Sequence, residues 1–435
     1  MAKIKPRYDG LVLGAGIAGM QAALDLAGQG FQVLVVEREP SIGGVMVGLN
    51  KVFPTLDCSS CICTPRMAEM AHHERIDLLT YTEVQQITQA GAGFEARLLK
   101  KPRYVVEEDC IGCSKCELAC DWLAPHEFDH GLGARKAIYI PHGNAIPQLP
   151  VLDPEHCIFD GACARACPKD CIDFAQLPEE LIVEAGTVIV ATGLKITPMA
   201  SKKEYGGEKY KNVISPLVME RMQSSNGPTG HEIRPSDGKV PRSIAYVQCA
   251  GSRDKSIGVP YCSRVCCMYA LKQAILLRQH LPQTEVTLYY MDIRAFGKGY
   301  EQFFRRAMAE GVRVVKAKVA RITEAPDKDL ILRLELIDEG GRVAELRHDL
   351  VVLSQGLVPG WRPNGALPIH MDSDGFFILP EVVTRPANSA IDGIFVAGVA
   401  TGPKDIPDAI VEAGAAAMEA AMYLDRTRVG ELAAV

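Results

Sequence analysis

Two groups of residues near the middle of the chain have the spacing of iron–sulfur cluster ligands. The first group follows the pattern C-x2-C-x2-C-x3-C and consists of Cys110, Cys113, Cys116 and Cys120. After 36 intervening residues the same spacing returns, with aspartate in the second place, at Cys157, Asp160, Cys163 and Cys167. This pattern wraps a tight loop around a four-iron cluster, so that three thiolates reach three irons. The spacing therefore predicts two 4Fe-4S clusters.

The fourth cysteine of each run is expected to bind the cluster of the other run. The first predicted cluster then has the ligands Cys110, Cys113, Cys116 and Cys167. The second has Cys120, Cys157 and Cys163, and it is completed by Asp160, a water molecule or Cys171. A carboxylate is a poorer ligand for soft iron than a thiolate. We therefore expect the second cluster to be labile, to lose one iron or to have a shifted reduction potential.

Alternatives for these cysteines are a zinc site and scattered core thiols. Zinc sites usually pair two C-x2-C knuckles, and packed core cysteines have no reason to keep a fixed spacing. The pattern favours clusters over both alternatives.

Four more cysteines form the pattern C-x12-C-x3-C-C, namely Cys249, Cys262, Cys266 and Cys267. Four thiolates at one place predict one further 4Fe-4S cluster. The alternatives are four structural cysteines or a zinc site, for which adjacent cysteines are poorly suited.

A shorter group lies in T-L-D-C-S-S-C-I-C-T-P-R-M at 55–67. We expect a helix to begin near Thr64-Pro65, because threonine suits the N-cap and proline the first turn. Thiolates at a helix N-terminus have lowered pKa values. Cys58 and Cys61 are therefore candidate catalytic residues, and the group could be a redox-active pair, a substrate sulfur site, extra ligands or, with Cys63, inert packed thiols.

The N-terminal part has the pattern of a dinucleotide-binding unit. Residues 9–37 read as a strand, a glycine loop, a helix and a second strand that ends in Glu37. Gly14 permits the tight turn, Gly16 lets a pyrophosphate approach the backbone, and Gly19 allows close packing of helix on strand. Glu37 would hold the ribose hydroxyls. Strand, helix and acid are all present, which makes an ordinary glycine turn the weaker interpretation.

The glycine pair Gly43-Gly44, which follows Glu37, is typical of the flavin version of this unit. Three further segments occur in order, Y-T-E-V at 81–84, T-V-I-V-A-T-G at 187–193 and G-I-F-V-A-G at 393–398. On these motifs the chain resembles flavoprotein disulfide reductases of the thioredoxin-reductase and glutathione-reductase type. In that family an aspartate follows the last glycine, but Val399 stands there, so the ribityl contact is expected to differ.

This resemblance implies FAD as a cofactor and an α/β fold with two Rossmann-like units. The adenine would lie against the backbone of Val84. The last helix, expected from Pro407 to Leu424, is rich in Ala and Met, so we expect it to pack closely inside the flavin domain. The expected FAD-binding residues are Gly14, Gly16, Ile17, Ala18, Gly19, Glu37, Arg38, Gly43, Gly44, Val84, Ala191, Thr192, Gly193 and Gly398, together with Lys404, Asp405, Ile406 and Pro407 from the resemblance of the tail described below.

The cluster-binding stretch lies between two expected strands of the flavin domain, at 94–99 and 180–186. It is therefore expected to be a two-cluster domain of the bacterial ferredoxin type, inserted into the flavin domain. We expect an FAD-binding domain at 1–100, 179–235 and 356–435, the insertion at 101–178, and a degenerate nicotinamide-type Rossmann domain at 236–355.

The second Rossmann-like unit lacks the glycine motif of a nicotinamide site. Where that motif should follow the expected strand at 244–248, the chain has Cys249-Ala-Gly-Ser. Phosphate binding at a helix N-terminus needs a close approach of the backbone. We therefore expect the cluster of the C-x12-C-x3-C-C group where NAD(P)H would otherwise lie.

Taken together, these motifs and the tail G-V-A-T-G-P-K-D-I-P-D-A-I resemble the family of heterodisulfide reductase A subunits over essentially the whole chain. The form is compact, as in heterodisulfide-reductase-like complexes of sulfur oxidisers. Compared with the methanogen form it has fewer exits for electrons, so the resemblance leaves open whether electron bifurcation occurs. In the family the tail lies against the isoalloxazine, so Lys404 is a candidate to tune the flavin; the alternative is a surface cation.

The resemblance implies an electron-transfer component of a sulfur-metabolising complex. Its implied partners are the other subunits, a lipoate- or persulfide-carrying protein, and a second copy of the chain in a homodimer. Three other functions stay open: the A subunit of a quinone-interacting oxidoreductase, a free-standing NAD(P)H-dependent iron–sulfur flavoprotein, and a scaffold whose clusters only hold the fold.

Composition limits the class of protein. The 435 residues are enough for two or three domains. A net charge of −6 argues against a nucleic-acid partner. The sequence contains no run of 18 apolar residues, so it predicts no membrane-spanning helix. The N-terminus does not read as a cleavable signal peptide. Fifteen cysteines in clustered spacings indicate metal binding in a reducing cytoplasm rather than disulfides.

Overall fold

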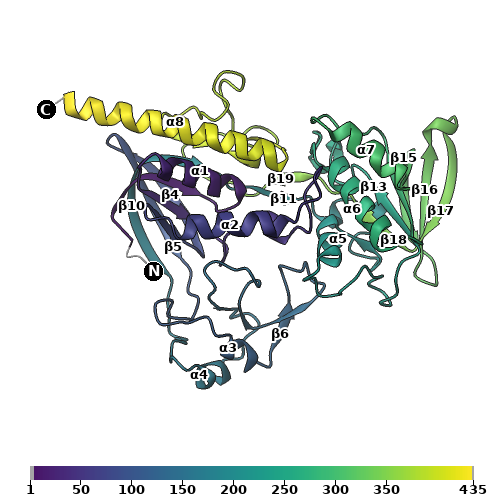
Figure 1. Ribbon diagram of the computed structural model, residues 1–435, viewed down its shortest axis with the longest axis horizontal. Helices are drawn as coiled ribbons and strands as arrows, with labels where there is room; N and C mark the ends of the chain where they lie inside the picture. The colour runs from purple at the N-terminus through teal and green to yellow at the C-terminus, as the bar shows by residue number, and fades with distance from the viewer. Residues whose placement is uncertain (1–3, 434–435) are drawn as a thin grey trace.

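The computed structural model describes residues 4–433, which form two sheet-centred units and an insertion (Figure 1). The first sheet has seven strands in the order β3-β2-β1-β10-β5-β4, and β20 also pairs with β10. Its strands are β1 (Arg7–Leu13), β2 (Val33–Val36), β3 (Ile76–Leu79), β4 (Thr82–Ala90), β5 (Gly93–Lys100), β10 (Glu179–Val190) and β20 (Ile394–Val396).

Two helices that are far apart in the sequence pack together over this sheet, α1 (Ile17–Gly28) and α8 (Ile406–Ala433) (Figure 1). The buried face of α8 is made mainly of small side chains, Ala409, Ala413, Ala416, Ala417, Ala420 and Ala421, and it ends at Leu424. Small residues on both helices let the backbones approach closely. The last helix was predicted to pack inside the flavin unit and does so, but it runs beyond Leu424 to Ala433.

Strand β10 is longer than the sequence suggested. The segments 180–186 and 187–193 were expected to be separate strands, but a single strand covers Glu179–Val190. Its first half pairs antiparallel with β5 and its second half parallel with β1 and β20. The last four residues are all buried between two neighbouring strands, which explains the apolar run at 188–190.

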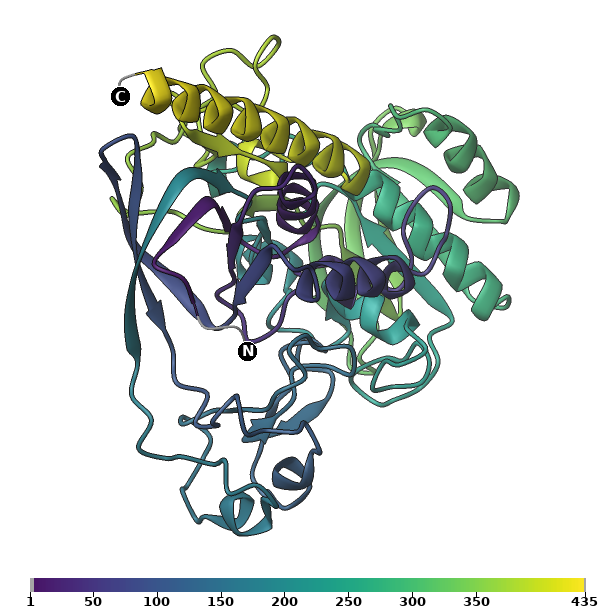
Figure 2. The same cartoon turned by 60° about the vertical axis from the view of Figure 1, so that its left-hand side comes forward.

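The insertion leaves and re-enters the first sheet at neighbouring positions, because Lys100 at the end of β5 pairs with Glu179 at the start of β10. In Figure 2 it forms a separate lobe beside the sheet. Its core includes Val105, Ile138, Leu152 and several cysteines. Its elements are short: β6 (Leu123–Pro125), β7 (Ala134–Lys136), β8 (Ile138–Tyr139), β9 (Val151–Leu152), α3 (Lys115–Leu118) and α4 (Ala162–Ala166).

The second unit has its own seven-stranded sheet, in the order β12-β18-β13-β14-β15-β16-β17. The strands are β12 (Val213–Ile214), β13 (Ser243–Val247), β14 (Glu285–Tyr290), β15 (Arg313–Glu324), β16 (Leu330–Leu336), β17 (Arg342–His348) and β18 (Leu350–Leu353). Its helices are α5 (Pro216–Gln223), α6 (Cys266–His280) and α7 (Tyr300–Ala309).

The expected start of the second unit at residue 236 needs correction. Strand β12 pairs with β18, so the chain already belongs to the second sheet at Val213. The chain crosses between the units on two short antiparallel strands, β11 (Leu194–Ile196) and β19 (Leu357–Pro359). Within residues 4–433, no helix is long and apolar enough to cross a membrane.

Candidate functional site

The glycine loop after β1 forms a cradle with no room for side chains at two positions. Gly14 has a φ of +98°, and a Cβ there would lie 2.5 Å from the carbonyl oxygen of Ala191. A Cβ on Gly19 would lie 1.8 Å from the carbonyl oxygen of Gly14. At Gly16, by contrast, a Cβ would meet only the Cα of Gly44, at 4.0 Å. The backbone is thus open where a pyrophosphate must approach and closed where helix packs on strand, which fits FAD.

Glu37 lies directly behind this loop. The residue is 8% exposed, and its carboxylate accepts hydrogen bonds from the backbone N–H groups of Ala15 (2.7 Å) and Glu39 (3.0 Å). Burial raises the pKa of Glu37, and the two N–H donors oppose that effect. The acid stands where a dinucleotide ribose is expected, and it also fixes the loop.

The other expected FAD residues lie around the same end of the sheet. Gly43 donates its N–H to the carbonyl of Ala15, and Gly44 approaches Gly16. Ala191, Thr192 and Gly193 follow the buried end of β10, and Gly398 packs on Ala18 of α1, where a Cβ would lie 2.7 Å away. Arg38 donates to the carbonyl of Gly360, and Val84 lies at a bulge in β4.

Lys404 is not a surface cation. Its side chain is 10% exposed, and its ammonium group pairs with Glu412 at 2.5 Å and contacts the hydroxyl of Thr401. Burial lowers the pKa of Lys404 even though Glu412 opposes that shift. The charge is thus held in place at the start of α8, beside the 3-10 helix Gly398–Thr401. Asp405, Ile406 and Pro407 form the first turn at that helix end.

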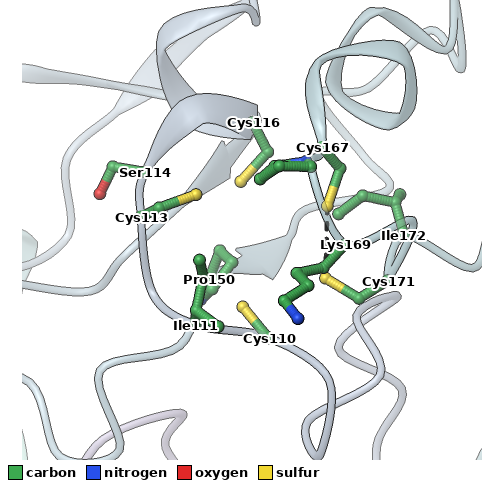
Figure 3. Close-up of a pocket in the computed structure, with 11 residues that line it drawn as sticks. Cys110, Ile111, Cys113, Ser114, Cys116, Pro150, Cys167, Lys169, Cys171 and Ile172 are labelled. Carbon is green, nitrogen blue, oxygen red and sulfur yellow. Dashed lines mark hydrogen bonds between the residues drawn. The ribbon is translucent and has the colours of Figure 1, made fainter.

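Five cysteines line one pocket in the insertion, Cys110, Cys113, Cys116, Cys167 and Cys171. Figure 3 shows their sulfur atoms directed toward a common space from two separate segments. The predicted first ligand set, including Cys167 from the second run, is therefore brought together. Cys171 also lies here, beside Cys167, so the structure does not favour it as the completing ligand of the second cluster.

The second set of thiols consists of Cys120, Cys157 and Cys163, which lie close enough to interact electrostatically. The two runs have positive φ angles at corresponding positions. Two residues after the first cysteine, φ is 65° at Gly112 and 58° at Phe159. Four residues after it, φ is 58° at Ser114 and 73° at Gly161. The second loop thus keeps the cluster-binding conformation despite its aspartate.

Asp160 occupies the position that corresponds to Cys113. Its carboxylate is exposed, and it accepts hydrogen bonds from the backbone N–H of Ala162 (2.9 Å) and the indole of Trp122 (3.4 Å). Both carboxylate oxygens of Asp160 thus already have hydrogen-bond donors from the chain itself. The three thiols of this set are the ligands that it can offer to a cluster without changing those contacts.

The third set is brought together by the loop between β13 and α6. Cys266 and Cys267 are buried in the first turn of α6 and interact with Cys249 and Cys262. Burial raises the pKa of Cys267 to about 11. Cys249 has a φ of 57° and stands two residues after β13, where a nicotinamide site would have glycine.

Two arginines, which share one carboxylate partner, lie near this third set. Arg253 lies beside Cys249 and pairs with Asp292 at 2.5 Å. Arg294 pairs with the same carboxylate at 3.0 Å. Cationic side chains favour an anionic cluster with four thiolates. These arginines were not predicted from the sequence, since their only signal was proximity to Cys249 and to the end of β14.

The sequence predicted metal binding rather than disulfides, but a disulfide joins Cys58 and Cys61, with a Cα–Cα distance of 5.2 Å. Cys58 is the N-cap of α2 (Ser59–Ala71), and its sulfur accepts a hydrogen bond from the N–H of Cys61 at 3.2 Å. The expected helix start near Thr64-Pro65 is therefore wrong. Pro65 lies inside α2, where its missing N–H leaves the carbonyl of Cys61 without its helical donor.

Cys63 differs from the other two cysteines of its group. It is fully buried, and its thiol contacts the carbonyl of Gly43 at 3.9 Å. Burial raises its pKa to about 11. Cys63 is therefore a packed core thiol, while Cys61 is exposed.

In the described part of the chain, no three His, Cys, Asp or Glu side chains converge closely enough to hold a single metal ion.

Comparisons with known proteins agree with this arrangement. Residues 9–97 match the family described as FAD dependent oxidoreductase, and residues 109–171 match the 4Fe-4S dicluster domain. The fold is similar to the thioredoxin reductases of T. acidophilum (TM-score 0.53, 15% identity, 96% of this chain and 99% of that chain) and Lactococcus lactis (TM-score 0.52, 15% identity, 96% and 99%). The thioredoxin-reductase-like fold with an inserted dicluster domain is thereby confirmed.

Similarity in sequence is high to one type of enzyme component. The chain is 48% identical over 417 residues to the iron–sulfur A subunit of the CoB–CoM heterodisulfide reductase of Methanocaldococcus jannaschii, covering 94% of this chain and 63% of that protein. It is 45% identical over 438 residues to the A subunit of the H2:CoB-CoM heterodisulfide, ferredoxin reductase of Methanothermobacter marburgensis, covering 98% and 66%. The chain spans less than two thirds of either relative. With its FAD and 4Fe-4S dicluster segments, it belongs to the family of heterodisulfide reductase A subunits.

Proposed function

We propose that this chain is the FAD- and iron–sulfur-containing electron-transfer component of a cytoplasmic heterodisulfide-reductase-like complex in sulfur metabolism. Bound FAD would supply conversion between two-electron and one-electron chemistry, and the clusters would supply single-electron transfer. The glycine cradle and Glu37 would hold the FAD, and the three cysteine sets would hold the clusters.

The main support for this proposal is a contact between two segments. One is the loop of the third cysteine set, and the other is the tail segment around Lys404 that is expected to lie beside the flavin. Arg264 follows Cys262 and donates to the carbonyl of Pro403 (3.3 Å) and to Asp408 Oδ2 (3.1 Å). The next residue, Val265, packs in one apolar cluster with Val399. The third set is therefore fixed against the tail segment that contains Lys404, which supports electron exchange between the two sites.

The third set also distinguishes this function from NAD(P)H oxidation. The loop from β13 to α6 presents thiols where a phosphate-binding loop would present glycines, and α6 begins only at Cys266. We expect NADPH to leave the flavin absorbance of the anaerobic protein unchanged. Reduction of the flavin by NADPH at a catalytic rate would contradict the proposal.

The disulfide supports a role for Cys58 and Cys61 in thiol chemistry. Cys61 is exposed at the start of α2 and thus open to a partner. We propose that the pair accepts two electrons and two protons from a dithiol, such as a lipoate-type carrier, whose two thiols become a disulfide in return. The remaining partners would be the other subunits and, as a homodimer, a second copy of the chain.

The decisive measurement is iron and acid-labile sulfide per flavin in anaerobically purified protein. We expect about twelve irons per FAD, for three four-iron clusters, or about one fewer if the site at Asp160 lacks an iron. Cys267→Ala should remove about four irons, whereas Cys63→Ala, a packed thiol outside the three sets, should remove none. An iron content near zero, with zinc in its place, would end the electron-transfer proposal.

A further inference from the structure

The pocket of the first cysteine set contains one thiol more than a four-iron cluster needs. Four cysteine thiolates complete such a cluster. The pocket is lined by Cys110, Cys113 and Cys116 from the first run and by two cysteines near the end of the insertion, Cys167 and Cys171. The second set, in contrast, is one thiol short at Asp160. The additional thiol therefore lies at the first set, which already has four cysteine ligands, and not at the second set, which has only three.

The two late cysteines contact each other directly. The sulfur atoms of Cys167 and Cys171 are 3.4 Å apart (Figure 3). Cys167 follows the last residue of α4, and Asp170, with a φ of 51°, turns the chain back so that Cys171 reaches the same pocket. Cys171 also lies near Cys110. A ligand position reached by one of these sulfurs is thus within a short displacement of the other.

The backbone at Cys171 is held firmly. Its carbonyl accepts the N–H of Val106 at 2.8 Å, and the adjacent Ile172 forms a bridge with Val105. Cys171 as a whole is 3% exposed. A thiol held in this way loses little additional conformational entropy when it becomes a ligand.

We propose that Cys171 is a reserve ligand of the first cluster, able to take the place of Cys167. The inference rests on the proposed function, because it presupposes a cluster at this set. In the exchange, the bond between iron and the Cys167 sulfur breaks and a bond to the Cys171 sulfur forms. The thiol proton of Cys171 passes to Cys167, so no electron is gained or lost.

The test compares the iron content of three full-length variants, purified anaerobically with their flavin. Cys167→Ala should keep the iron content and the cluster EPR signals of the unmodified protein, because Cys171 replaces the lost ligand. Cys113→Ala removes a ligand that Figure 3 shows on the opposite side of the pocket from Cys171, and it should lose about one to four irons. The double variant Cys167→Ala/Cys171→Ala should lose as much.

Loss of as much iron from Cys167→Ala as from Cys113→Ala would overturn the inference. Absence of iron from the unmodified protein would instead overturn the proposed function, so the two failures are distinguishable.

A second measurement does not depend on the stability of those variants. Cys171→Ala keeps all four first-choice ligands and should start with the full iron content. A strong iron chelator should then remove iron several-fold faster than from the unmodified protein, because a ligand that dissociates is no longer replaced. Cys63→Ala should behave like the unmodified protein. Equal rates of iron loss for Cys171→Ala and the unmodified protein would contradict the reserve role.

Discussion

The hydroxyl of Tyr300 donates a hydrogen bond to Asp405 Oδ2 at 2.6 Å, which joins α7 of the second unit to the start of α8 in the first. The other carboxylate oxygen of Asp405 accepts the N–H of Asp408 at 3.0 Å and so caps α8. Burial raises the pKa of Tyr300, and the hydrogen bond to Asp405 adds to that shift. The phenol therefore remains a donor at neutral pH.

Tyr300→Phe should lower the free energy of unfolding by about 1 kcal/mol, the usual net value of a hydrogen bond, or somewhat more because the acceptor is charged. Thermal or urea unfolding measures the change. Tyr290→Phe, at the end of β14, is the matched control and should change stability by less. Equal effects of both substitutions would mean that the contact with Asp405 contributes nothing.

Gly19→Ala should abolish flavin binding. Its Cβ would lie 1.8 Å from a backbone oxygen of the cradle, so the loop must move. Gly28→Ala is the control on the same helix, since a Cβ there has no atom within 4 Å. We expect flavin content to fall more than tenfold in Gly19→Ala. In Gly28→Ala it should stay unchanged, with stability equal or higher by up to about 1 kcal/mol. Full flavin content in Gly19→Ala would refute the assignment of this loop to the FAD.

Alkylation followed by mass spectrometry should separate the three cysteines of α2. In air-oxidised protein the peptide with Cys58 and Cys61 should carry one disulfide, and after mild reduction both thiols should be alkylated. Cys63 should react only after unfolding, because it is buried and its pKa is raised to about 11. Alkylation of Cys63 before Cys61 in the folded protein would contradict the roles assigned to them.

Lys272→Met should be strongly destabilising. Lys272 pairs with Glu220 in the interior, where both side chains are at most 3% exposed. The same carboxylate accepts the N–H of Asn50 at 2.9 Å, so it cannot leave the interior easily. Removing one partner of a buried pair costs about 3–5 kcal/mol.

The control for that prediction is Arg305→Met, which breaks an exposed pair with Glu301 on α7. This change should cost about 0–1 kcal/mol. The two values are compared by chemical denaturation at neutral pH. Similar losses in the two variants would show that burial of the Lys272 pair does not determine its contribution.

Much of the fold could be predicted because its signals are local in the sequence. The glycine loop, Glu37 and the cysteine spacings each belong to one short segment with a fixed geometry. The insertion was predictable for a different reason. The strand patterns at 94–99 and 180–186 were expected to belong to the same sheet, and the corresponding strands β5 and β10 do pair with each other.

Other features depended on contacts that no local pattern records. The two-residue strand β12 is too short to show a period, so the start of the second unit was placed too late. Pro65 suggested a helix start, but α2 tolerates it internally. Cys171 reaches the first pocket only because of the left-handed turn at Asp170. The bond between Tyr300 and Asp405 joins residues 105 positions apart.

The pairing of Lys100 with Glu179 has a consequence for how such proteins diversify. Two hydrogen-bonded strands form a stem, and a stem of this kind can be closed by a short hairpin turn as well as by a whole domain. The flavin sheet keeps its register in either case. An electron-carrying module can therefore be gained, lost or exchanged at this single point in evolution or by design, without altering the core that holds the flavin.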